Sequence, residues 1–300
     1  MKAHKSGFVN IIGRPNAGKS TLLNALLGER LSVETPKAQT TRHRIKGILN
    51  GEHYQIIFSD TPGIVENPSY EMHEMMNQFV KSAFEDADVL MLILDGSRPK
   101  DSLPDEWLDA VKNAIFPKIL LINKKDLTSM EELLVIADRW QKQIGFDEII
   151  PISAIEKSET QAKLLPIINS LIPEAPPYYP KDQWTDKSTR FFISEIIRGH
   201  IMKQFKEEVP YSCEVVVDEF KVPEDTNDLY RIRSTIFVNR KSQKSILIGK
   251  RGAAIKKLGT AARYDIEKFL DNRVYLELHV KVLEKWRDNK QSLRRFGYEG

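Results

Sequence analysis

The sequence that decides the fold is Gly13-Arg14-Pro15-Asn16-Ala17-Gly18-Lys19-Ser20-Thr21. It follows the apolar run Phe8–Ile12, and it precedes leucines at helical spacing, namely Leu22, Leu23, Leu26 and Leu27. An apolar run, a glycine-rich turn and an amphipathic segment predict a strand, a loop and a helix in that order. Gly28 follows the leucines and is typical of a helix end.

The spacing Gly-x4-Gly-Lys-Ser within this stretch is typical of a phosphate-binding loop. Such a loop points its backbone N–H groups at a phosphate from the N-terminus of a helix. Lys19 would reach the β- and γ-phosphates, and the Ser20 hydroxyl would bind Mg²⁺. We therefore expect a nucleoside triphosphate site formed by Gly13, Asn16, Ala17, Gly18, Lys19, Ser20 and Thr21.

The composition narrows the class of protein. Three hundred residues, 41% hydrophobic and 29% charged, can form a sizeable core and are typical of two domains. The single cysteine, Cys213, excludes an internal disulfide and a cysteine-rich zinc site, and it fits a reducing compartment. The start of the chain has no apolar signal segment, and the run Val89–Leu94 is far too short to span a bilayer. We therefore expect a cytoplasmic protein whose membrane contacts, if any, are peripheral.

Apolar runs after the first helix predict the rest of a sheet. His43–Leu49 and Tyr54–Phe58 flank Asn50-Gly51, which is the strongest short signal for a hairpin. One antiparallel edge strand is therefore expected on an otherwise parallel sheet. Further strands are expected at Val89–Asp95, Lys118–Ile122 and Glu148–Ile152.

The strand at Tyr54–Phe58 leads into Asp60-Thr61-Pro62-Gly63. An aspartate at the end of a strand beside a phosphate loop is where a Mg²⁺ ion is held, usually through water. Gly63 could offer its N–H group to a γ-phosphate. By itself, Asp-Thr-Pro-Gly indicates only a turn. A functional role is favoured because this sequence is expected to lie beside the phosphate loop.

The strand at Lys118–Ile122 leads into Asn123-Lys124-Lys125-Asp126, which identifies the base. A carboxylate at Asp126 can accept hydrogen bonds from both N1–H and the N2 amine of guanine, whereas adenine has no such donor pair. Asn123 would tie this loop to the phosphate loop, and the Lys124 stem could cover the base. At the last strand, the backbone of Ser153-Ala154 could meet the guanine O6.

The proline-rich stretch Ile172–Pro180 can continue neither a helix nor a central strand. We place a domain boundary here and expect a semi-rigid linker. The predicted organisation is a GTP-binding domain at 1–172, a linker at 173–186, a second domain at 187–283 and a basic tail helix at 284–300. Periodicity in the second domain predicts the order α-β-β-α-α-β.

The second domain contains Gly249-Lys250-Arg251-Gly252 between two predicted helices, directly after Ile248. A Gly-x-x-Gly loop in this context clamps the backbone of single-stranded nucleic acid in KH domains. It lies in a basic, acid-free stretch, Arg240–Lys257, which favours a nucleic-acid surface. The alternative is an ordinary corner between two helices with a solvated basic face. In the tail, Trp286 and Phe296 could stack on bases or could anchor the tail on its domain.

From Ser6 to Leu171, these motifs resemble the five G motifs of translation-factor-class GTPases. Within that class, Lys37–His43 is similar to the switch I of the Era family, and the KH-like second domain extends the resemblance over nearly the whole chain. Switch I supplies a threonine to Mg²⁺ when GTP is bound, and we favour Thr41, with Thr40 as the alternative. The resemblance implies an α/β P-loop GTPase domain with a mostly parallel sheet and one antiparallel edge strand, followed by an α+β type II KH domain.

The Era resemblance also implies a function. It is that of a monomeric, GTP-hydrolysing switch that binds small-subunit ribosomal RNA near its 3′ end and acts in assembly of the small ribosomal subunit. It implies a cytoplasmic location with some peripheral association with the cell membrane. Lys19, Thr41 and Gly63 would take part in hydrolysis, and Ile248, Gly249, Lys250, Arg251 and Gly252 would bind RNA.

One departure concerns catalysis. The residue after Gly63 is Ile64, which cannot orient water as a glutamine does. Related GTPases with an apolar residue here and an asparagine at the place of Asn16 can recruit K⁺ beside the phosphates. We hypothesise the same here, while a loop-stabilising role for Asn16 stays open. Because Ile64 makes slow turnover plausible, a second function stays open, that of a nucleotide-sensing RNA-binding module. A third function, that of a metabolic P-loop kinase, is disfavoured, because a kinase would not need to read guanine through Asp126.

Overall fold

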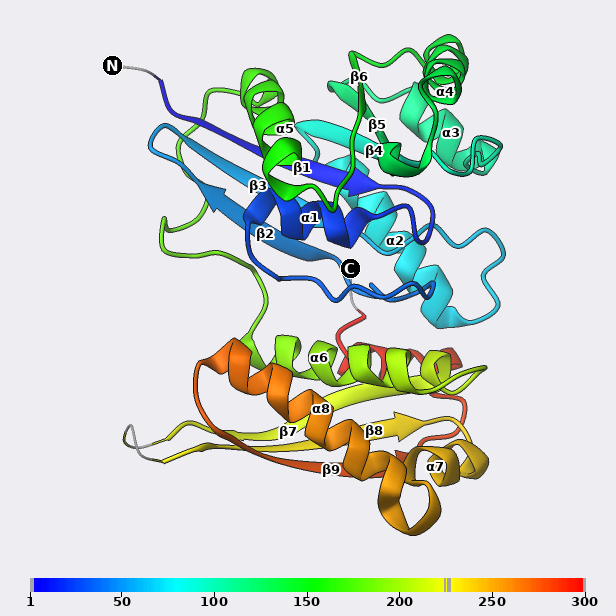
Figure 1. Cartoon of the computed structure of the whole chain (residues 1–300), viewed down its shortest axis with the longest axis vertical. Helices are drawn as coiled ribbons and strands as arrows, with labels where there is room; N and C mark the ends of the chain where they lie inside the picture. The colour runs from blue at the N-terminus through cyan, green and yellow to red at the C-terminus, as the bar shows by residue number, and fades with distance from the viewer. Residues whose placement is uncertain (1–2, 224, 226–227, 299–300) are drawn as a thin grey trace. The chain divides into compact units, whose positions relative to one another are not determined.

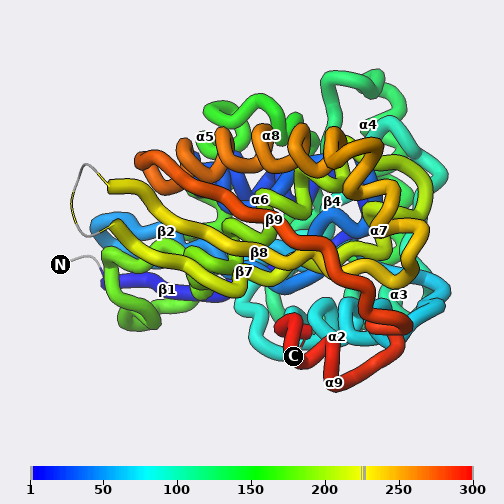
Figure 2. Tube along the Cα trace, turned by 90° about the horizontal axis from the view of Figure 1, so that it is seen from below, coloured from blue at the N-terminus to red at the C-terminus, as the bar shows by residue number. Residues whose placement is uncertain are grey.

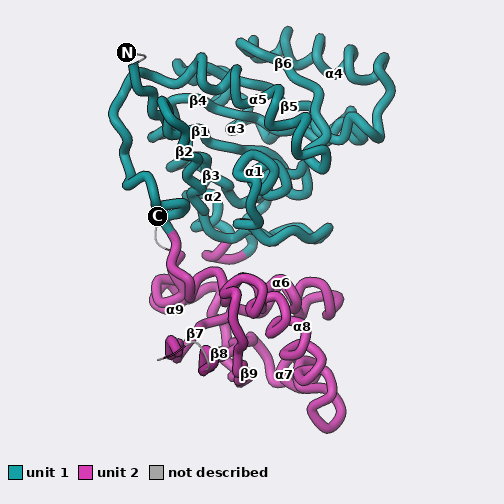
Figure 3. Tube along the Cα trace, turned by 60° about the vertical axis from the view of Figure 1, so that its left-hand side comes forward, with its two compact units in different colours: residues 1–69, 73–186, 300 teal, residues 70–72, 187–299 magenta. Residues whose placement is uncertain are grey.

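The computed structural model describes residues 3–223, 225 and 228–298. The chain divides into two compact units, shown in Figure 3. The first unit comprises residues 1–69 and 73–186, and the second comprises 187–299 together with 70–72. The segment 173–186, expected as a linker, thus belongs to the first unit.

The first unit is built on a six-stranded sheet with the order β2-β3-β1-β4-β5-β6 (Figure 1). β2 pairs antiparallel with β3 at one edge, and every other pairing is parallel, which confirms the predicted sheet. The strands are β1 (Lys5–Ile12), β2 (Ile45–Asn50), β3 (Tyr54–Asp60), β4 (Val89–Asp95), β5 (Lys118–Asn123) and β6 (Glu148–Pro151).

Helices cover both faces of this sheet. The helices are α1 (Lys19–Leu27), α2 (Glu71–Glu85), α3 (Asp105–Lys112), α4 (Met130–Gln143) and α5 (Lys157–Leu171). Figure 1 shows α1 and α5 on one face. On the other face, Val80 of α2, Trp107 of α3 and Trp140 of α4 share one core with alternate residues of β4 and β5. Because parallel strands all end at the same edge, the loops after β1, β3, β4, β5 and β6 meet at one rim.

The segment 173–186 runs along the outer edge of this sheet. Thr185 forms an antiparallel bridge with Gly47, and the Ile48 N–H donates to the Trp184 carbonyl at 2.9 Å. Further back, the Gln55 carboxamide accepts the N–H groups of both Tyr178 and Tyr179 at 2.8 and 2.9 Å. The prolines do prevent a helix, and the segment is hydrogen-bonded to β2 and β3 although most of its residues are exposed.

The second unit has the predicted order α-β-β-α-α-β. It contains α6 (Thr189–Gln204), β7 (Cys213–Lys221), β8 (Tyr230–Val238), α7 (Lys241–Ile248), α8 (Ala253–Leu270) and β9 (Val274–Val282). Figure 2 shows the three strands side by side; β7 and β8 are antiparallel, and β8 and β9 are parallel. Apolar residues of the three helices pack on one face of the sheet, and Cys213 is buried among them.

The tail is less helical than expected. It forms a single turn, η4 (Trp286–Asp288), and the six-residue helix α9 (Lys290–Arg295). Trp286 is fully buried, and its Nε1 donates to the Ser212 carbonyl at 3.1 Å. Phe296 packs on Trp286 and on Phe237, with ring centroids 5.5 and 5.3 Å apart. These two rings therefore anchor the tail, which was the alternative to stacking on bases.

Within the described ranges, none of the helices combines the length and apolar character needed to cross a membrane.

Candidate functional site

The loop between β1 and α1 is shaped by close approaches that exclude side chains. Gly13 has a φ of 155°, and a Cβ there would lie 2.4 Å from the Ile93 carbonyl oxygen of β4. Gly18 has a φ of 106°, and its Cβ would lie 2.2 Å from the Asn123 Nδ2 atom. The two glycines therefore let the loop pass against β4 and the loop after β5 at the rim of the sheet.

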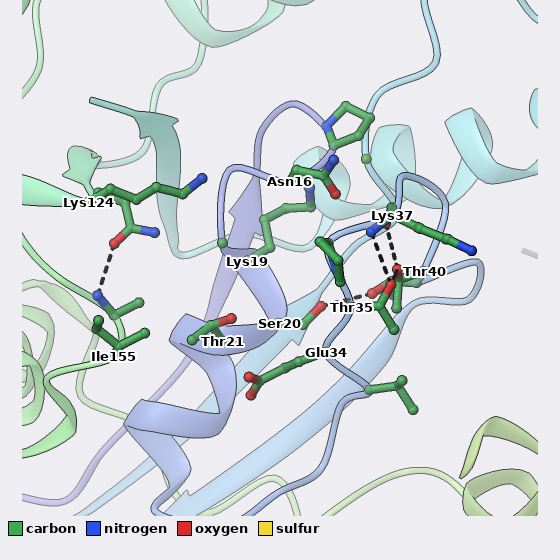
Figure 4. A pocket seen from close by; sticks show the side chains of 18 of the residues that line it. Asn16, Lys19, Ser20, Thr21, Glu34, Thr35, Lys37, Thr40, Lys124 and Ile155 are labelled. Carbon is green, nitrogen blue, oxygen red and sulfur yellow. Dashed lines mark hydrogen bonds between the residues drawn. The ribbon is translucent and has the colours of Figure 1, made fainter. Parts of the chain in front are cut away.

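This loop opens onto a pocket of about 600 Å³ in the first unit (Figure 4). The sequence-predicted residues that line it are Asn16, Gly18, Lys19, Ser20, Thr21, Thr41, Gly63, Asn123, Lys124, Asp126, Ser153 and Ala154. Gly13, Ala17 and Asp60 lie beneath this surface and are buried. Residues from six separate loops and helix ends are thus brought to one cavity. Its volume is in the range typical of small-molecule sites.

Lys19 lies at the centre of the pocket with only 6% of its surface exposed. Its Nζ atom donates to the carbonyl oxygens of Gly13 and Arg14 at 3.1 and 2.9 Å. Burial lowers the pKa of Lys19 to about 8, against the opposing effect of the Asp60 charge. The two carbonyl oxygens of the phosphate loop and the Asp60 charge thus stabilise the Lys19 ammonium group.

The predicted Mg²⁺ ligands converge beside Lys19. The Ser20 hydroxyl donates to Asp60 Oδ2 at 2.7 Å and lies 2.9 Å from the Thr41 hydroxyl, which itself donates to the same Oδ2 at 3.2 Å. Burial raises the pKa of Asp60, while the Lys19 charge and the Ser20 hydrogen bond oppose that rise. Asp60 Oδ1 is buried and has no hydrogen-bond partner among the described residues. This set of hard oxygen donors fits Mg²⁺.

The geometry also separates the two neighbouring threonines of switch I. The Thr40 hydroxyl points away from Asp60; it donates to the Lys37 carbonyl at 2.7 Å and lies 2.5 Å from the Thr35 hydroxyl. The Thr41 hydroxyl lies within hydrogen-bond distance of both Ser20 and Asp60. The arrangement therefore favours Thr41 as the residue that would meet the metal.

At the other end of the pocket, Asn123 holds three loops together. Its Nδ2 donates to the Ala17 carbonyl at 2.8 Å, and its Oδ1 accepts the Ala154 N–H at 2.9 Å. The expected link between this loop and the phosphate loop is confirmed. The Ser153 hydroxyl donates to Asp126 Oδ1 at 2.6 Å. The side chain of Ser153 therefore orients the Asp126 carboxylate, a role separate from the one expected of its backbone.

Two residues that bear on this end of the site were not predicted from the sequence: Asp95, which contacts the pocket residue Lys124, and Ile155, which lines the pocket. Asp95, the last residue of β4, pairs with the Lys124 ammonium group at 2.6 Å and so fixes where the Lys124 stem lies. Burial tends to raise the Asp95 pKa, but hydrogen bonds from Lys124 and Ser97 hold it below its usual range. Ile155 is 71% exposed and lines the pocket across from Lys124 (Figure 4). Its place directly after Ser153-Ala154 was the available signal.

The segment that begins at Gly63, after β3, is called switch II below, and its start is packed against the phosphate loop. A Cβ on Gly63 would lie 2.8 Å from the Pro15 side chain, and the Ile64 N–H donates to the Gly13 carbonyl at 3.4 Å. Ile64 is 3% exposed, belongs to the core and is not among the residues that line the pocket. Asn16, in contrast, is exposed, has a φ of 66° and lines the pocket.

The Gly-x-x-Gly loop lies in the second unit, between α7 and α8. Gly249 has a φ of 72°, and a Cβ there would lie 2.6 Å from the Ala254 Cβ. Gly252 has a φ of 80° but open space around the position of its Cβ. Lys250 and Arg251 are exposed, whereas Ile248 packs against the core of the unit. The loop thus presents two cations and a bare backbone to solvent.

Comparisons with known proteins find matches to both units of the chain. The family model for 50S ribosome-binding GTPases matches residues 8–124, and the family model for KH domains matches residues 208–287. The GTPase Era of Syntrophus aciditrophicus is 45% identical over 297 residues, covering 98% of this chain and 95% of that protein. The GTPase Era of Geotalea daltonii is 42% identical and covers 98% of each chain.

Solved structures give the same result. An Era structure in complex with MgGDPNP and nucleotides 1506–1542 of 16S ribosomal RNA matches with a TM-score of 0.93 and 37% identity, covering 99% of this chain and 100% of that one. A variant of Aquifex aeolicus Era bound to GDP and AlF₄⁻ matches with a TM-score of 0.91, again at 37% identity and with the same coverage. From these relatives and from the two matched domains, the chain belongs to the Era family of GTPases.

Proposed function

We propose that this protein is a GTP-hydrolysing switch that binds small-subunit ribosomal RNA near its 3′ end through its second unit, and that it acts in assembly of the small ribosomal subunit. One observation carries the proposal: a pocket with a guanine-reading end and a metal-binding end shares the chain with an exposed Gly-x-x-Gly loop. The solved Era complex that contains both a GTP analogue and 16S ribosomal RNA supports it.

In this proposal, each end of the pocket has its own chemistry. Asp126, oriented by Ser153, accepts the N1–H and N2 hydrogens of guanine, and the backbone of Ser153-Ala154 lies toward O6. Lys19 leaves the carbonyls of Gly13 and Arg14 to pair with the β- and γ-phosphates. Ser20, Thr41 and Asp60 would hold Mg²⁺, which when bound neutralises phosphate charge.

Hydrolysis depends on what orients the water and stabilises the charge that develops on the γ-phosphate. The buried Ile64 side chain supplies neither function, while its backbone N–H donates to the Gly13 carbonyl and Gly63 lies against Pro15 of the phosphate loop. We propose that K⁺, bound by Asn16, supplies the missing positive charge. The exposed side chain of Asn16 at the pocket rim supports this role.

Three further parts of the proposal follow from the family resemblance: the protein acts as a monomer, in the cytoplasm, with peripheral association with the cell membrane. The second candidate function is that of a nucleotide-sensing RNA-binding module with negligible turnover. The burial of Ile64 favours it, because slow intrinsic hydrolysis is then expected. Multiple-turnover hydrolysis with and without RNA separates the two candidates.

The base assignment predicts a change of specificity. Asn in place of Asp126 keeps one acceptor and gains a donor, so Asp126→Asn should favour xanthosine over guanosine nucleotides by at least about 100-fold relative to the unsubstituted protein. Competition of GDP and XDP for a fluorescent nucleotide measures this ratio. Unaltered GDP selectivity would contradict the role of Asp126.

The lowered pKa of Lys19 predicts proton uptake on nucleotide binding. Near pH 7 the amine is already charged, whereas above its pKa of about 8 part of it is neutral, and the phosphates restore its proton. GDP affinity should therefore fall as pH rises above 8. Calorimetry in buffers of different ionisation heat, without Mg²⁺, should show uptake at about pH 8.5 and almost none at about pH 7. Lys19→Arg is the control, because a guanidinium stays protonated throughout.

The potassium hypothesis predicts a cation-dependent rate. GTP hydrolysis should be about tenfold faster in KCl than in NaCl, a small share of the ~10³ or more that an arginine finger supplies. Asn16→Ala should remove the difference and leave GDP binding within about twofold. Equal rates in the two salts, or an Asn16→Ala protein that still responds to K⁺, would contradict the hypothesis.

The RNA-binding loop predicts a loss of RNA binding that spares the GTPase. Gly252→Asp adds a negative charge where the loop has open space, so it should weaken binding of an RNA with the 3′ end of the small-subunit rRNA by about tenfold or more. GTP hydrolysis without RNA should be unchanged. Filter binding and phosphate release measure the two effects.

The matched control is Gly252→Ala, which has the same strained backbone but no charge. Binding of the same RNA with GDP and with a non-hydrolysable GTP analogue then tests the switch itself. Equal RNA affinity in the two nucleotide states would remove the coupling, and joint loss of RNA binding and GTPase activity in Gly252→Asp would show that the two sites are not separable.

A further inference from the structure

The loop between α1 and β2, which carries switch I, is fastened to α1 by one buried side chain. Asn24 is 1% exposed and lies on the helix that begins with Lys19. Its Oδ1 accepts the N–H groups of Leu31 and Ser32, both at 2.8 Å. Its Nδ2 donates to the Ser32 carbonyl at 2.8 Å and to Glu34 Oε1 at 2.5 Å. One carboxamide thus makes four hydrogen bonds to the loop.

A second asparagine holds the start of switch II in a similar way. Asn77 of α2 accepts the Val65 N–H at 3.0 Å on its Oδ1 and donates to the Val65 carbonyl at 2.9 Å through its Nδ2. A carboxamide is both donor and acceptor, so it pairs with a single residue as a neighbouring strand would. Val65 follows Gly63 and the buried Ile64, so the bonds fix the backbone directly after the γ-phosphate contact.

These bonds act on loops that have little other regular structure. Between Gly28 and Ile45 the described chain forms no helix or strand, and between Asp60 and Glu71 it is likewise irregular. Hydrogen bonds to the backbone are therefore what sets the position of each loop relative to the pocket. Glu34 itself lines that pocket beside Ser20 and Thr21 (Figure 4).

The arrangement that the two asparagines hold is the one that a triphosphate needs. With Asn24 in place, the loop carries Thr41 to within hydrogen-bond distance of Ser20 and Asp60. With Asn77 in place, Gly63 lies against Pro15 of the phosphate loop. GDP has no γ-phosphate to meet Gly63, so its binding depends much less on this arrangement.

We propose that Asn24 and Asn77 are positioning residues of the two switches, which stabilise the arrangement that binds GTP over arrangements that bind only GDP. This inference rests on the proposed GTPase function. Neither asparagine lines the pocket, so both act through the backbone that they hold. Their removal changes the balance between the two nucleotides rather than nucleotide binding as such.

The test replaces each carboxamide by a carboxylate of nearly the same shape. Asn24→Asp and Asn77→Asp keep the acceptor but lose the Nδ2 donor, and they set a carboxylate against a carbonyl oxygen. In each variant, affinity for a non-hydrolysable GTP analogue with Mg²⁺ should fall by about tenfold, and kcat should fall similarly. GDP affinity should stay within about twofold. Asn169→Asp, on α5 and outside the pocket, is the matched control.

A charge-swap variant sharpens the test for Asn24. In Asn24→Asp/Glu34→Gln, the amide of residue 34 can donate to the new carboxylate, which restores one bond with donor and acceptor exchanged. The double variant should recover part of the GTP-analogue affinity that Asn24→Asp loses, and Glu34→Gln alone should not raise that affinity above the value of the unsubstituted protein. If the two asparagines only stabilised the fold, Asn24→Asp and Asn77→Asp would lower the thermal stability of the protein without changing its ratio of GTP-analogue to GDP affinity.

An unchanged affinity ratio in folded Asn24→Asp and Asn77→Asp overturns the proposal. If Asn24→Asp fails to fold, Asn24→Ser, which introduces no buried charge, takes its place, and Asn77→Asp at a partly exposed position gives an independent result. Binding of both nucleotides by the unsubstituted protein is measured first. Absence of guanine nucleotide binding there would refute the proposed function, whereas normal binding with an unmoved ratio in the variants refutes only the positioning role.

Discussion

The pocket depends on the two hydrogen bonds of the Asn123 side chain. One reaches the carbonyl of Ala17 in the phosphate loop, and the other takes the N–H of Ala154 after β6. Three loops from different parts of the chain are thereby fixed to one another with almost no exposed surface. The Asn123 amide also lies where a side chain at position 18 would be, so the need for glycine there comes from this contact as well as from its backbone. The end of the site that binds phosphate and the end that reads the base are in this way parts of one rigid structure.

The charged groups of the site are, by contrast, poorly satisfied by the protein alone. Burial lowers the pKa of Lys19 and raises that of Asp60, so each group is pushed toward its neutral form. A nucleotide with a divalent cation brings a negative charge to the first and a positive charge to the second. Burying these two charged groups lowers the stability of the protein, and a ligand of opposite charges stabilises their charged forms when it enters the cavity. The loops joined by Asn123 line this cavity, whereas the described residues between Gly28 and Ile45 and between Asp60 and Glu71 form no helix or strand.

Much of this could be predicted from the sequence, because the decisive motifs are local. The Gly13–Thr21 stretch, Asn50-Gly51 and the apolar runs indicated the sheet, and the link from Asn123 to the phosphate loop was predicted, whereas the contact of the Ser153 hydroxyl with Asp126 was not. What was missed depends on contacts between distant segments. Nothing around Asp95 indicates that it meets Lys124, 29 residues later. Thr40 and Thr41 are chemically alike, and only the path of the loop decides which one faces Asp60. The tail aromatics were open between two roles until the burial of Trp286 and the packing of Phe296 on Trp286 and Phe237 identified them as anchors.

The bonds between segment 173–186 and β2 also affect how the sheet meets its surroundings. An edge strand with free N–H and C=O groups is a template on which another chain can pair. Here Trp184 and Thr185 occupy those groups along the middle of β2. At the opposite edge, β6 has only four residues, which leaves little length for a foreign strand to join. The segment expected to be a spacer therefore also protects the GTPase unit against edge-to-edge aggregation.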